Sequence, residues 1–373
     1  MLTLKIAYRN VFRQRRRSLL TGLSMTGGYI LFVFSYSLLE GSYSGIIDIF
    51  TLDNTGHIQI HKDDYLDRPK IYKSIQASTA LENHLSNHDE VKSFTPRVFS
   101  PALAYAGDKT VPSRVIGVDP TLEPKVTRLE EKVSDGKYFD TSPNADGYFQ
   151  SMIGKGVAIS LDLEIGDEII LISQGADGSI ANDIFSVSAV IGNRTSFDRM
   201  AVYLPLSAAQ EFLSLGNDLH EYAILVHDDK NNEKIARVLQ EQLPNLTVSP
   251  WQIVEATFYR TMQSDKQGNY FGMALVVFIV FIGVLNTVLM SVLERTREFG
   301  VLRSIGCRPG ELVKMIAMET LLLTTLSMII GILMVTPIIF WFSEVGIALP
   351  APVDMGGISF QDMKGEFASY VFL

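Results

Sequence analysis

The sequence predicts an α-helical membrane protein that carries a large α+β domain outside the membrane. Three stretches of the 373-residue chain contain no charged residue, at 18–39, 267–293 and 320–343. Each stretch is long enough to cross about 30 Å of hydrocarbon as a helix. Between the first two stretches, short alternating runs are separated by Gly and Pro, a pattern typical of strands and turns. We therefore expect transmembrane spans at 18–40 and 267–293, and a third inside a helix at 309–343.

The charges at the membrane boundaries predict the orientation of these spans. Residues 1–17 contain no acidic residue and six basic ones, Lys5, Arg9, Arg13, Arg15, Arg16 and Arg17. Basic flanks remain in the cytoplasm, so residues 1–17 are expected to form a cytoplasmic amphipathic helix. Residues 41–266 are then external, 294–308 cytoplasmic and 344–373 external. A cleaved signal peptide is the alternative, although no small-x-small site follows at 40–44.

The external segment reads as two lobes. A strand at GHIQIH (56–61), a helix at 74–85 and a strand at 91–105 are followed much later by a second strand-helix-strand unit at 222–251. The two units predict one ferredoxin-like lobe at 53–105 and 216–266. The punctuated runs between them predict an inserted β-rich lobe at 106–215. Alternation in GHIQIH places Ile58 and Ile60 on a buried face and the polar residues on a solvated one.

Composition and motifs indicate a protein that performs no chemistry itself. The net charge is −9, with the cytoplasmic segments basic, so no nucleic-acid partner is expected. The one cysteine, Cys307, belongs to the cytoplasmic segment, so the external domain is expected to fold without an internal disulfide. No nucleophile elbow, zincin helix or phosphate loop is present. We therefore expect no catalytic residue and no cofactor in this chain.

At the start of the external domain, His57 and His61 precede Asp63 and Asp64 and are candidates for a metal site. Imidazole and carboxylate are common metal ligands. In a straight strand, however, the two histidines lie about 13 Å apart. A solvated polar face is therefore the expected role of these residues, and no metal is expected.

The segment 294–308 holds the candidate site residues. Phe299, Leu302 and Ile305 recur three apart and are expected to share an apolar face. Charged residues are expected around it, namely Glu294, Arg295, Arg297, Glu298 and Arg303. This composition predicts a short helix with an apolar anchor and a charged rim, suited to docking on a partner. The alternative is an amphipathic helix that lies on the inner leaflet.

Further residues are expected to organise the helices. Pro309 and Glu311 favour the start of a new helix that continues into the third span. Glu319 lies where that helix becomes apolar, and we expect it to pair with a nearby arginine. Within the spans, Gly27, Gly28 and Asn286 are candidates for close helix packing or for a subunit interface.

The stretch NTVLMSVLERTREFGVLRSIG (286–306), together with GHIQIH and GVDP (117–120), resembles the FtsX-like, MacB-type permeases of type VII ABC transporters. The appearance is closest to their lipoprotein-releasing (Lol) branch. The resemblance implies that 294–308 is a coupling helix which docks on a cytoplasmic ABC ATPase dimer, where ATP and Mg²⁺ are bound. It further implies an inner-membrane location, a second permease subunit, contact with membrane lipid and possible work with a periplasmic lipoprotein carrier. The family has four spans, so a fourth is expected to be missing from a chain that stops at Leu373.

On this basis the expected function is conversion of ATP hydrolysis in a partner into movement of the periplasmic domain, with lipoproteins or lipid-like molecules as cargo. Three alternatives remain open. The first is the permease of a peptide or macrolide exporter, which a long gripping loop at the tip of the domain would favour. The second is FtsX-like signalling to a periplasmic effector without transport. The last is a membrane-anchored sensor without an ATPase.

Overall fold

The computed structural model describes residues 15–144, 147–194 and 196–345. These residues form two compact units, a membrane unit and an external unit, which divide at residues 45/46 and 260/261. Most of the predicted basic helix and nearly all of the predicted external segment 344–373 lie outside the described residues.

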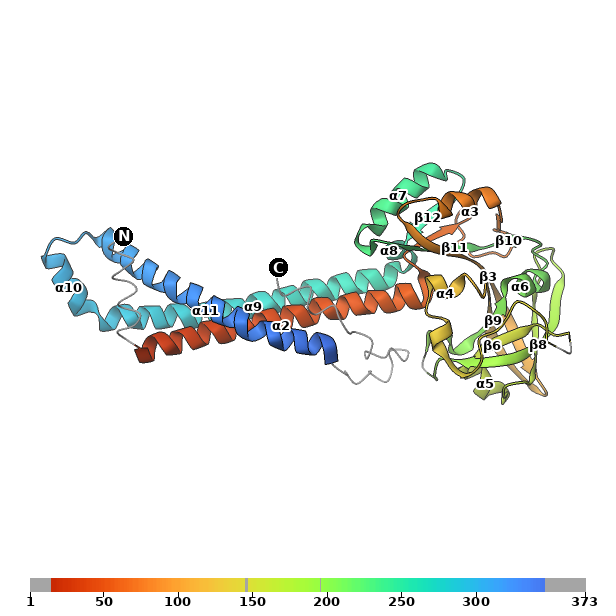
Figure 1. Cartoon of the computed structure of the whole chain (residues 1–373), viewed down its shortest axis with the longest axis horizontal. Coiled ribbons are helices and arrows are strands. Elements are labelled where there is room, and N and C mark those ends of the chain that lie inside the picture. Colours follow the sequence, from red (N-terminus) through yellow and green to blue (C-terminus); the bar gives the residue numbers. More distant parts are fainter. Residues whose placement is uncertain (1–14, 145–146, 195, 346–373) are drawn as a thin grey trace. The chain divides into compact units, whose positions relative to one another are not determined.

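Three long helices contain the three predicted spans. They lie side by side in the membrane unit (Figure 1), and one short helix connects the second of them to the third. The helices are α2 (Arg15–Phe50), α9 (Ala256–Glu294), α10 (Thr296–Ser304) and α11 (Pro309–Val345). By length and composition, α2, α9 and α11 can each cross a membrane. Much of the α9 surface is apolar and exposed, as expected of a helix that faces lipid or another subunit.

The helices extend well past the predicted ends of the spans. α9 has 39 residues, which corresponds to about 58 Å at 1.5 Å per residue. The hydrocarbon core accounts for only about 30 Å of that length. Residues 41–50 and 256–266, which were expected to belong to the external domain, therefore remain helical. A loss of hydrophobicity ends a membrane span, but it does not end a helix.

The first lobe of the external unit has the predicted ferredoxin-like arrangement. Its strands pair antiparallel in the order β12-β1-β11-β3. The strands are β1 (Ile58–His61), β3 (Val91–Ala106), β11 (Glu221–Val226) and β12 (Thr247–Pro250). Helices α3 (Thr79–Ser86) and α7 (Asn232–Gln242) bury Leu85, Ile235 and Leu239 in the same core as Ile58 and Ile60. Ile58 and Ile60 therefore form the buried apolar face that the alternation predicts.

The inserted lobe continues the same sheet rather than forming a separate one. The 16-residue strand β3 pairs with β11 through its first half and with β4 through its second half. In the described chain the sheet then runs β4-β9-β6-β8-β5, and β7 pairs with β3 and β8. These strands are β4 (Lys109–Val118), β5 (Val133–Gly136), β6 (Gln150–Gly154), β7 (Glu168–Gln174), β8 (Ile180–Ile191) and β9 (Ala201–Pro205). One continuous strand therefore ties the two lobes together.

Short elements complete the external unit. They are the strands β2 (Ile75–Gln76) and β10 (Asp218–Leu219), the helices α4 (Glu123–Val126), α5 (Lys155–Leu161), α6 (Leu206–Phe212) and α8 (Trp251–Val254), the π-helical turn η1 (Thr51–Thr55), and the 3-10 turns η2 (Glu130–Lys132), η3 (Phe197–Met200) and η4 (Asp229–Asn231). The helix expected at 74–85 is shorter and begins later, because Ser78 caps it by accepting the Ala80 N–H at 3.3 Å.

The predicted solvated face of GHIQIH is wrong. His57, Gln59 and His61 are buried, as are Ile58 and Ile60. The second face of the sheet is covered, since Leu52 of η1 and Val126 of α4 pack on Ala223 and Leu225 there. Polar side chains on this face are therefore bonded inside the fold rather than hydrated.

Candidate functional site: the coupling turn and the helix junction

The coupling turn, defined as residues 294–308, is a compact connection between α9 and α11 in the membrane unit. The backbone leaves the α9 helix at Arg295 and resumes as α10 one residue later. α10 ends through Gly306, whose φ of +102° is unfavourable for residues with a Cβ. The Cys307 N–H then bonds the Leu302 carbonyl at 3.1 Å, and the Glu311 carboxylate accepts the Arg308 N–H at 3.0 Å. The C-terminal end of the turn is thus fixed by local hydrogen bonds.

Arg295 does not belong to the exposed charged rim, contrary to the sequence-based expectation. Its side chain is 10% exposed and bonds Glu298 at 2.9 Å and Glu319 at 3.0 Å. Its guanidinium also lies 5.4 Å from the centroid of the Phe299 ring. The break between α9 and α10 at this residue lets the side chain turn inward, which helical periodicity alone does not predict. The expected pairing of Glu319 with an arginine is confirmed.

The coupling turn presents an apolar patch that differs in part from the predicted one. Ile305 is 78% exposed and Leu302 is 36% exposed, as a docking face requires, whereas Phe299 is half-buried beside Arg295. Val301, which was not among the predicted residues, is 59% exposed. The charged residues Glu294, Arg297, Glu298 and Arg303 are exposed around this patch. We call Val301, Leu302 and Ile305 the coupling patch.

The selected residues inside the spans behave differently from one another. A Cβ on Gly28 would lie 2.8 Å from Val280 Cγ1, so this glycine permits close packing of α2 on α9. Gly27 has no atom within 4 Å of the same position. Asn286 is exposed and makes no hydrogen bond with the described residues. Gly331 was missed, although a Cβ there would lie 2.6 Å from the Tyr29 ring and it permits contact of α11 with α2.

Polar contacts join α2 and α9 where their apolar stretches end. Lys266 Nζ lies 2.6 Å from a Glu40 carboxylate oxygen, and the Asn269 amide donates to the Tyr43 hydroxyl at 2.9 Å. The Glu40 side chain is 9% exposed. These contacts hold the two helices together within the membrane unit.

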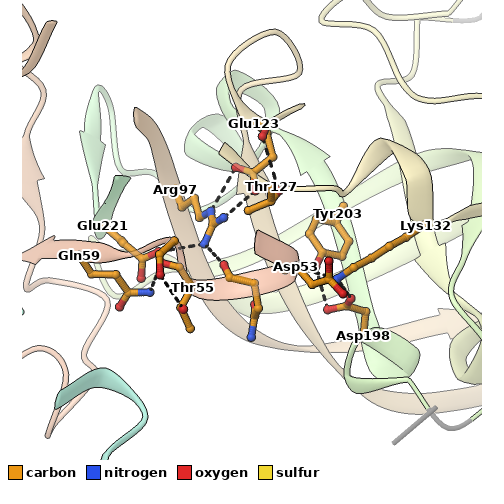
Figure 2. A network of polar contacts seen from close by, with 12 residues as sticks. Asp53, Thr55, Gln59, Arg97, Glu123, Thr127, Lys132, Asp198, Tyr203 and Glu221 are labelled. Carbon is orange, nitrogen blue, oxygen red and sulfur yellow. Dashed lines mark hydrogen bonds and ion pairs between the residues drawn. The ribbon is translucent and has the colours of Figure 1, made fainter. Parts of the chain in front are cut away.

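A second set of polar contacts fixes the chain where α2 enters the external unit. We call it the junction network (Figure 2), and it consists of η1, Arg97, Glu123, Glu221, Lys132, Asp198 and Tyr203. Within η1 the Gly56 N–H closes the turn on the Thr51 carbonyl at 2.7 Å. Gly56 has φ of +69°, and a Cβ there would lie 3.0 Å from the Ile224 carbonyl oxygen. Only glycine suits this position, where the helix gives way to β1.

Arg97 connects the η1 turn to the first lobe. One guanidinium nitrogen donates to the Asn54 carbonyl at 2.6 Å and to Glu221 at 3.0 Å. The other two nitrogens donate to Glu123 at 3.1 and 2.6 Å. The residue is buried, and Glu221 also bonds the His61 ring at 3.2 Å. A buried guanidinium is tolerated because all of its nitrogens are paired with acceptors.

Lys132 connects Asp53, the residue before Asn54 in the η1 turn, to the inserted lobe. Its ammonium donates to the Asp53 carbonyl at 2.7 Å and to Asp198 at 2.7 Å. Asp198 also accepts the Tyr203 hydroxyl at 2.9 Å. Two consecutive carbonyls of η1, which follows α2, are therefore each held by a cation, one in each lobe.

The network sets the protonation of its members. Burial acts to raise the pKa of Glu221, but the His61 hydrogen bond and the Arg97 charge lower the pKa below its usual value. Burial and the neighbouring Asp198 raise the pKa of the Tyr203 hydroxyl well above its ordinary value. At neutral pH, Glu221 is therefore an anion and Tyr203 a neutral donor.

No group of three or more potential metal ligands occurs among the described residues.

Comparisons with known proteins agree with this architecture. The profile of the MacB-like periplasmic core domain matches residues 18–242, and that of the FtsX-like permease C-terminal domain matches residues 270–361. The chain therefore belongs to the FtsX-like permeases with a MacB-like periplasmic core domain. It is a membrane protein with a large α+β domain.

Among curated proteins, the chain is 25% identical over 233 residues to the lipoprotein-releasing system transmembrane protein LolE of Haemophilus influenzae, covering 61% of this chain and 55% of that protein. It is 22% identical over 320 residues to LolC of Xylella fastidiosa, covering 82% and 76%. It is 24% identical over 382 residues to the macrolide export protein MacB of Shewanella, covering 92% and 53%. The chain thus spans little more than half the length of several relatives.

Among solved structures, the periplasmic region of MacB from Actinobacillus actinomycetemcomitans covers 58% of this chain and 97% of its own length, with 14% identity and a TM-score of 0.39.

Proposed function

We propose that this chain is the membrane permease subunit of a MacB/Lol-type ABC transporter. A separate cytoplasmic ATPase dimer binds and hydrolyses ATP with Mg²⁺, and the coupling patch docks in a groove on it. A second permease, either another copy or a paralogue, completes the membrane part in the bacterial inner membrane. The N-terminus and the coupling turn face the cytoplasm, and the α+β domain faces the periplasm.

The observation that carries this proposal is the exposed apolar patch on α10, a short helix between two apolar spans. Val301, Leu302 and Ile305 together expose apolar surface at a position where the chain is otherwise charged. A small apolar centre with a polar rim is the usual anatomy of a docking site. The Arg295–Glu319 pair couples the turn to α11, so that docking at α10 acts on the end of α9 and on the start of α11.

Movement then reaches the periplasmic domain along helices that have no break between membrane and domain. α2 continues to Phe50 and ends in the η1 turn, which Arg97 and Lys132 hold. We propose that displacement of α2 moves both lobes of the domain, because each cation belongs to one lobe. The cargo would be a lipoprotein or lipid-like molecule already on the periplasmic side, received in some cases by a periplasmic carrier protein. Similarity to LolE and LolC supports this cargo class.

Export of a peptide or macrolide is the second candidate, supported by similarity to MacB over 92% of this chain. The two candidates share the same mechanics and differ only in cargo. Cargo that copurifies with the complex separates them, since an acylated protein supports the first and an unacylated small molecule or peptide supports the second.

Docking is tested by copurification in mild detergent with mass spectrometry of the bound proteins. An ATPase should accompany the wild-type chain and be lost from a Leu302→Asp/Ile305→Asp variant, while membrane insertion is retained. These two positions are preferable to Phe299, whose ring packs on Arg295 inside the turn. Ile180→Asp, a change at an 82% exposed position of the external unit, is the matched control and should retain the ATPase. An ATPase that stays bound to the double variant would contradict the docking assignment.

A further inference from the structure

The external unit contains a cavity of about 580 Å³ that the proposed coupling mechanism does not use. Its volume falls within the range of about 300–1,000 Å³ that is typical of small-molecule sites. Much of its wall is apolar and comes from the loop after β1, from β3 and from the end of α8. The apolar lining includes Tyr65, Leu66, Ile71, Phe99, Pro101 and Val254.

An aromatic stack forms part of this wall. The Tyr65 ring lies between His61 and His220, with centroid distances of 5.5 and 5.1 Å. His220 is fixed in turn, because it accepts the Phe99 N–H at 2.9 Å and bonds the Ile71 carbonyl at 2.9 Å. The wall is thus held in place without a ligand, which lowers the entropy cost of binding.

The charges that line the cavity favour an anion. Arg97 and Glu221 are already paired with each other. Lys70 and Arg114 also line the cavity, and neither forms an ion pair with any described residue. The remaining acid is Glu255, whose pKa is raised by burial, an effect that the charge of Arg114 partly offsets. The lining thus holds two exposed cations without an ion pair among the described residues, beside an apolar wall.

A buried polar atom at the same place lacks a partner. The His61 Nε2 bonds the Glu221 carboxylate, whereas His61 Nδ1 is buried and has no hydrogen bond in the described chain. Buried polar atoms are normally satisfied, and an unsatisfied one calls for a missing partner. When a neutral ring donates its Nε2–H to this carboxylate, Nδ1 is an acceptor, which a ligand hydroxyl or amide N–H could satisfy.

We infer that this cavity is a binding site for an amphipathic organic anion. Its apolar part lies on Tyr65, Phe99 and Val254, and its carboxylate, sulfonate or phosphate group pairs with Arg114 and Lys70. Guanidinium and ammonium groups form strong charge-assisted hydrogen bonds with such anions. A hydroxyl or amide donor on the same molecule reaches His61 Nδ1.

The position of the cavity gives the ligand a route to influence movement. Its lining includes Asn54 and Thr55 at the end of η1, and Val254 and Glu255 just before α9. A bound molecule therefore touches both chain segments that continue into membrane-spanning helices. Binding itself goes beyond the proposed transport function and does not depend on it, so the site can be tested without an ATPase.

The test uses the full chain in lipid nanodiscs and the photoreactive anion para-benzoylbenzoate. After illumination, labelled peptides are located by mass spectrometry, which separates the cavity from probe dissolved in the lipid. The labels should map to residues 61–71, 97–101 and 250–255. The neutral analogue para-benzoylbenzyl alcohol should label these peptides less than the carboxylate does.

The decisive comparison is Lys70→Gln/Arg114→Gln against Lys234→Gln/Arg237→Gln. The second pair removes the same charge from exposed positions of α7, away from the cavity lining. Loss of charge-assisted hydrogen bonds should raise the probe concentration for half-maximal cavity labelling about tenfold in the first pair and leave it unchanged in the second. Equal labelling in both variants, or labelling confined to the membrane helices, would overturn the assignment.

Discussion

Arg295 and Glu319 join the coupling turn to the third membrane helix, with the guanidinium Nη1 3.0 Å from the carboxylate. Their side chains are only 10% and 13% exposed. The pair therefore connects the break between α9 and α10 to α11 in a place with little solvent. The contact adds a side-chain link between the turn and α11 to the covalent connection of the chain.

Breaking this pair should uncouple the turn from α11. Glu319→Gln leaves the Arg295 charge partly buried with Glu298 as its remaining carboxylate, and we expect a loss of stability on the order of 3 kcal/mol. The thermal midpoint of the detergent-solubilised chain measures this loss. Glu298→Gln, at a side chain that is 48% exposed, should cost less than about 1 kcal/mol. The exchange Arg295→Glu/Glu319→Arg should recover part of the stability, and a failure of Glu319→Gln to lower the midpoint would contradict the role of the pair.

Arg97 should be the most sensitive residue of the junction network. Arg97→Met removes the partner of two buried carboxylates and of the Asn54 carbonyl, at an expected cost of about 3–5 kcal/mol. Chemical denaturation followed by tryptophan fluorescence measures the effect, since Trp251 lies in the external unit.

The matched control for Arg97→Met is Arg237→Met, because Arg237 is exposed and its contact with Glu233 is 3.7 Å long. That substitution should change stability by less than about 1 kcal/mol. Equal effects of the two substitutions would show that the buried network does not stabilise the junction.

Much of the fold could be predicted from the sequence, and the junction network could not. The spans follow from uncharged runs, and the ferredoxin-like lobe from two strand-helix-strand patterns, because both are local properties of the chain. The network joins Arg97 to partners 26 and 124 residues away. One local indication existed: Arg97 is the only charged residue in the run 93–106. A lone charge in a long apolar strand is paired when it is buried.

The buried face of β1 was missed for the same reason. Alternation indicates that successive side chains point to opposite faces, but it does not reveal whether a second layer covers the polar face. Here η1 and α4 provide that layer, and both come from segments without regular periodicity. The inward turn of Arg295 likewise depends on a one-residue break between helices, which helical spacing does not reveal.

The external unit should lose stability as the pH falls below about 6.5. Burial lowers the pKa of His220, outweighing the Ile71 hydrogen bond and the charges of Glu221 and Asp218, which raise it. In the unfolded chain His220 is therefore protonated near pH 6.5, whereas in the folded chain it is protonated only at a lower pH. Stability is present above that pH and is lost as the pH falls through the folded pKa.

Thermal midpoints at pH 7.5 and 5.5 test this dependence. His220→Gln should be less stable at both pH values, because the Phe99 N–H loses its acceptor. Its midpoint should nevertheless fall less than that of the wild type between the two pH values. His84→Gln, at an exposed position, should keep the wild-type difference. An unchanged pH dependence in His220→Gln would exclude His220 as its source.

Two adjacent glycines provide an internal comparison for helix packing. Gly28→Leu should disturb the contact of α2 with α9, since its Cβ alone would approach Val280 to 2.8 Å. Overpacking of this kind costs about 1–3 kcal/mol. The space around Gly27 is open, so Gly27→Leu should be tolerated within the single chain. Midpoints of the monomeric, detergent-solubilised protein distinguish the two, and equal values would contradict the packing role of Gly28.

The most direct test of the central claim is whether ATP turnover by the partner moves the external domain. In a Cys307→Ser background, which removes the one native cysteine, a donor dye on Ile180→Cys reports energy transfer to acceptor-labelled lipid headgroups in nanodiscs that contain the ATPase. The account predicts that ATP changes the transfer efficiency in the otherwise native chain and leaves it unchanged when Leu302→Asp/Ile305→Asp is added. The account is contradicted if the complex with the otherwise native chain hydrolyses ATP and the energy-transfer efficiency does not change.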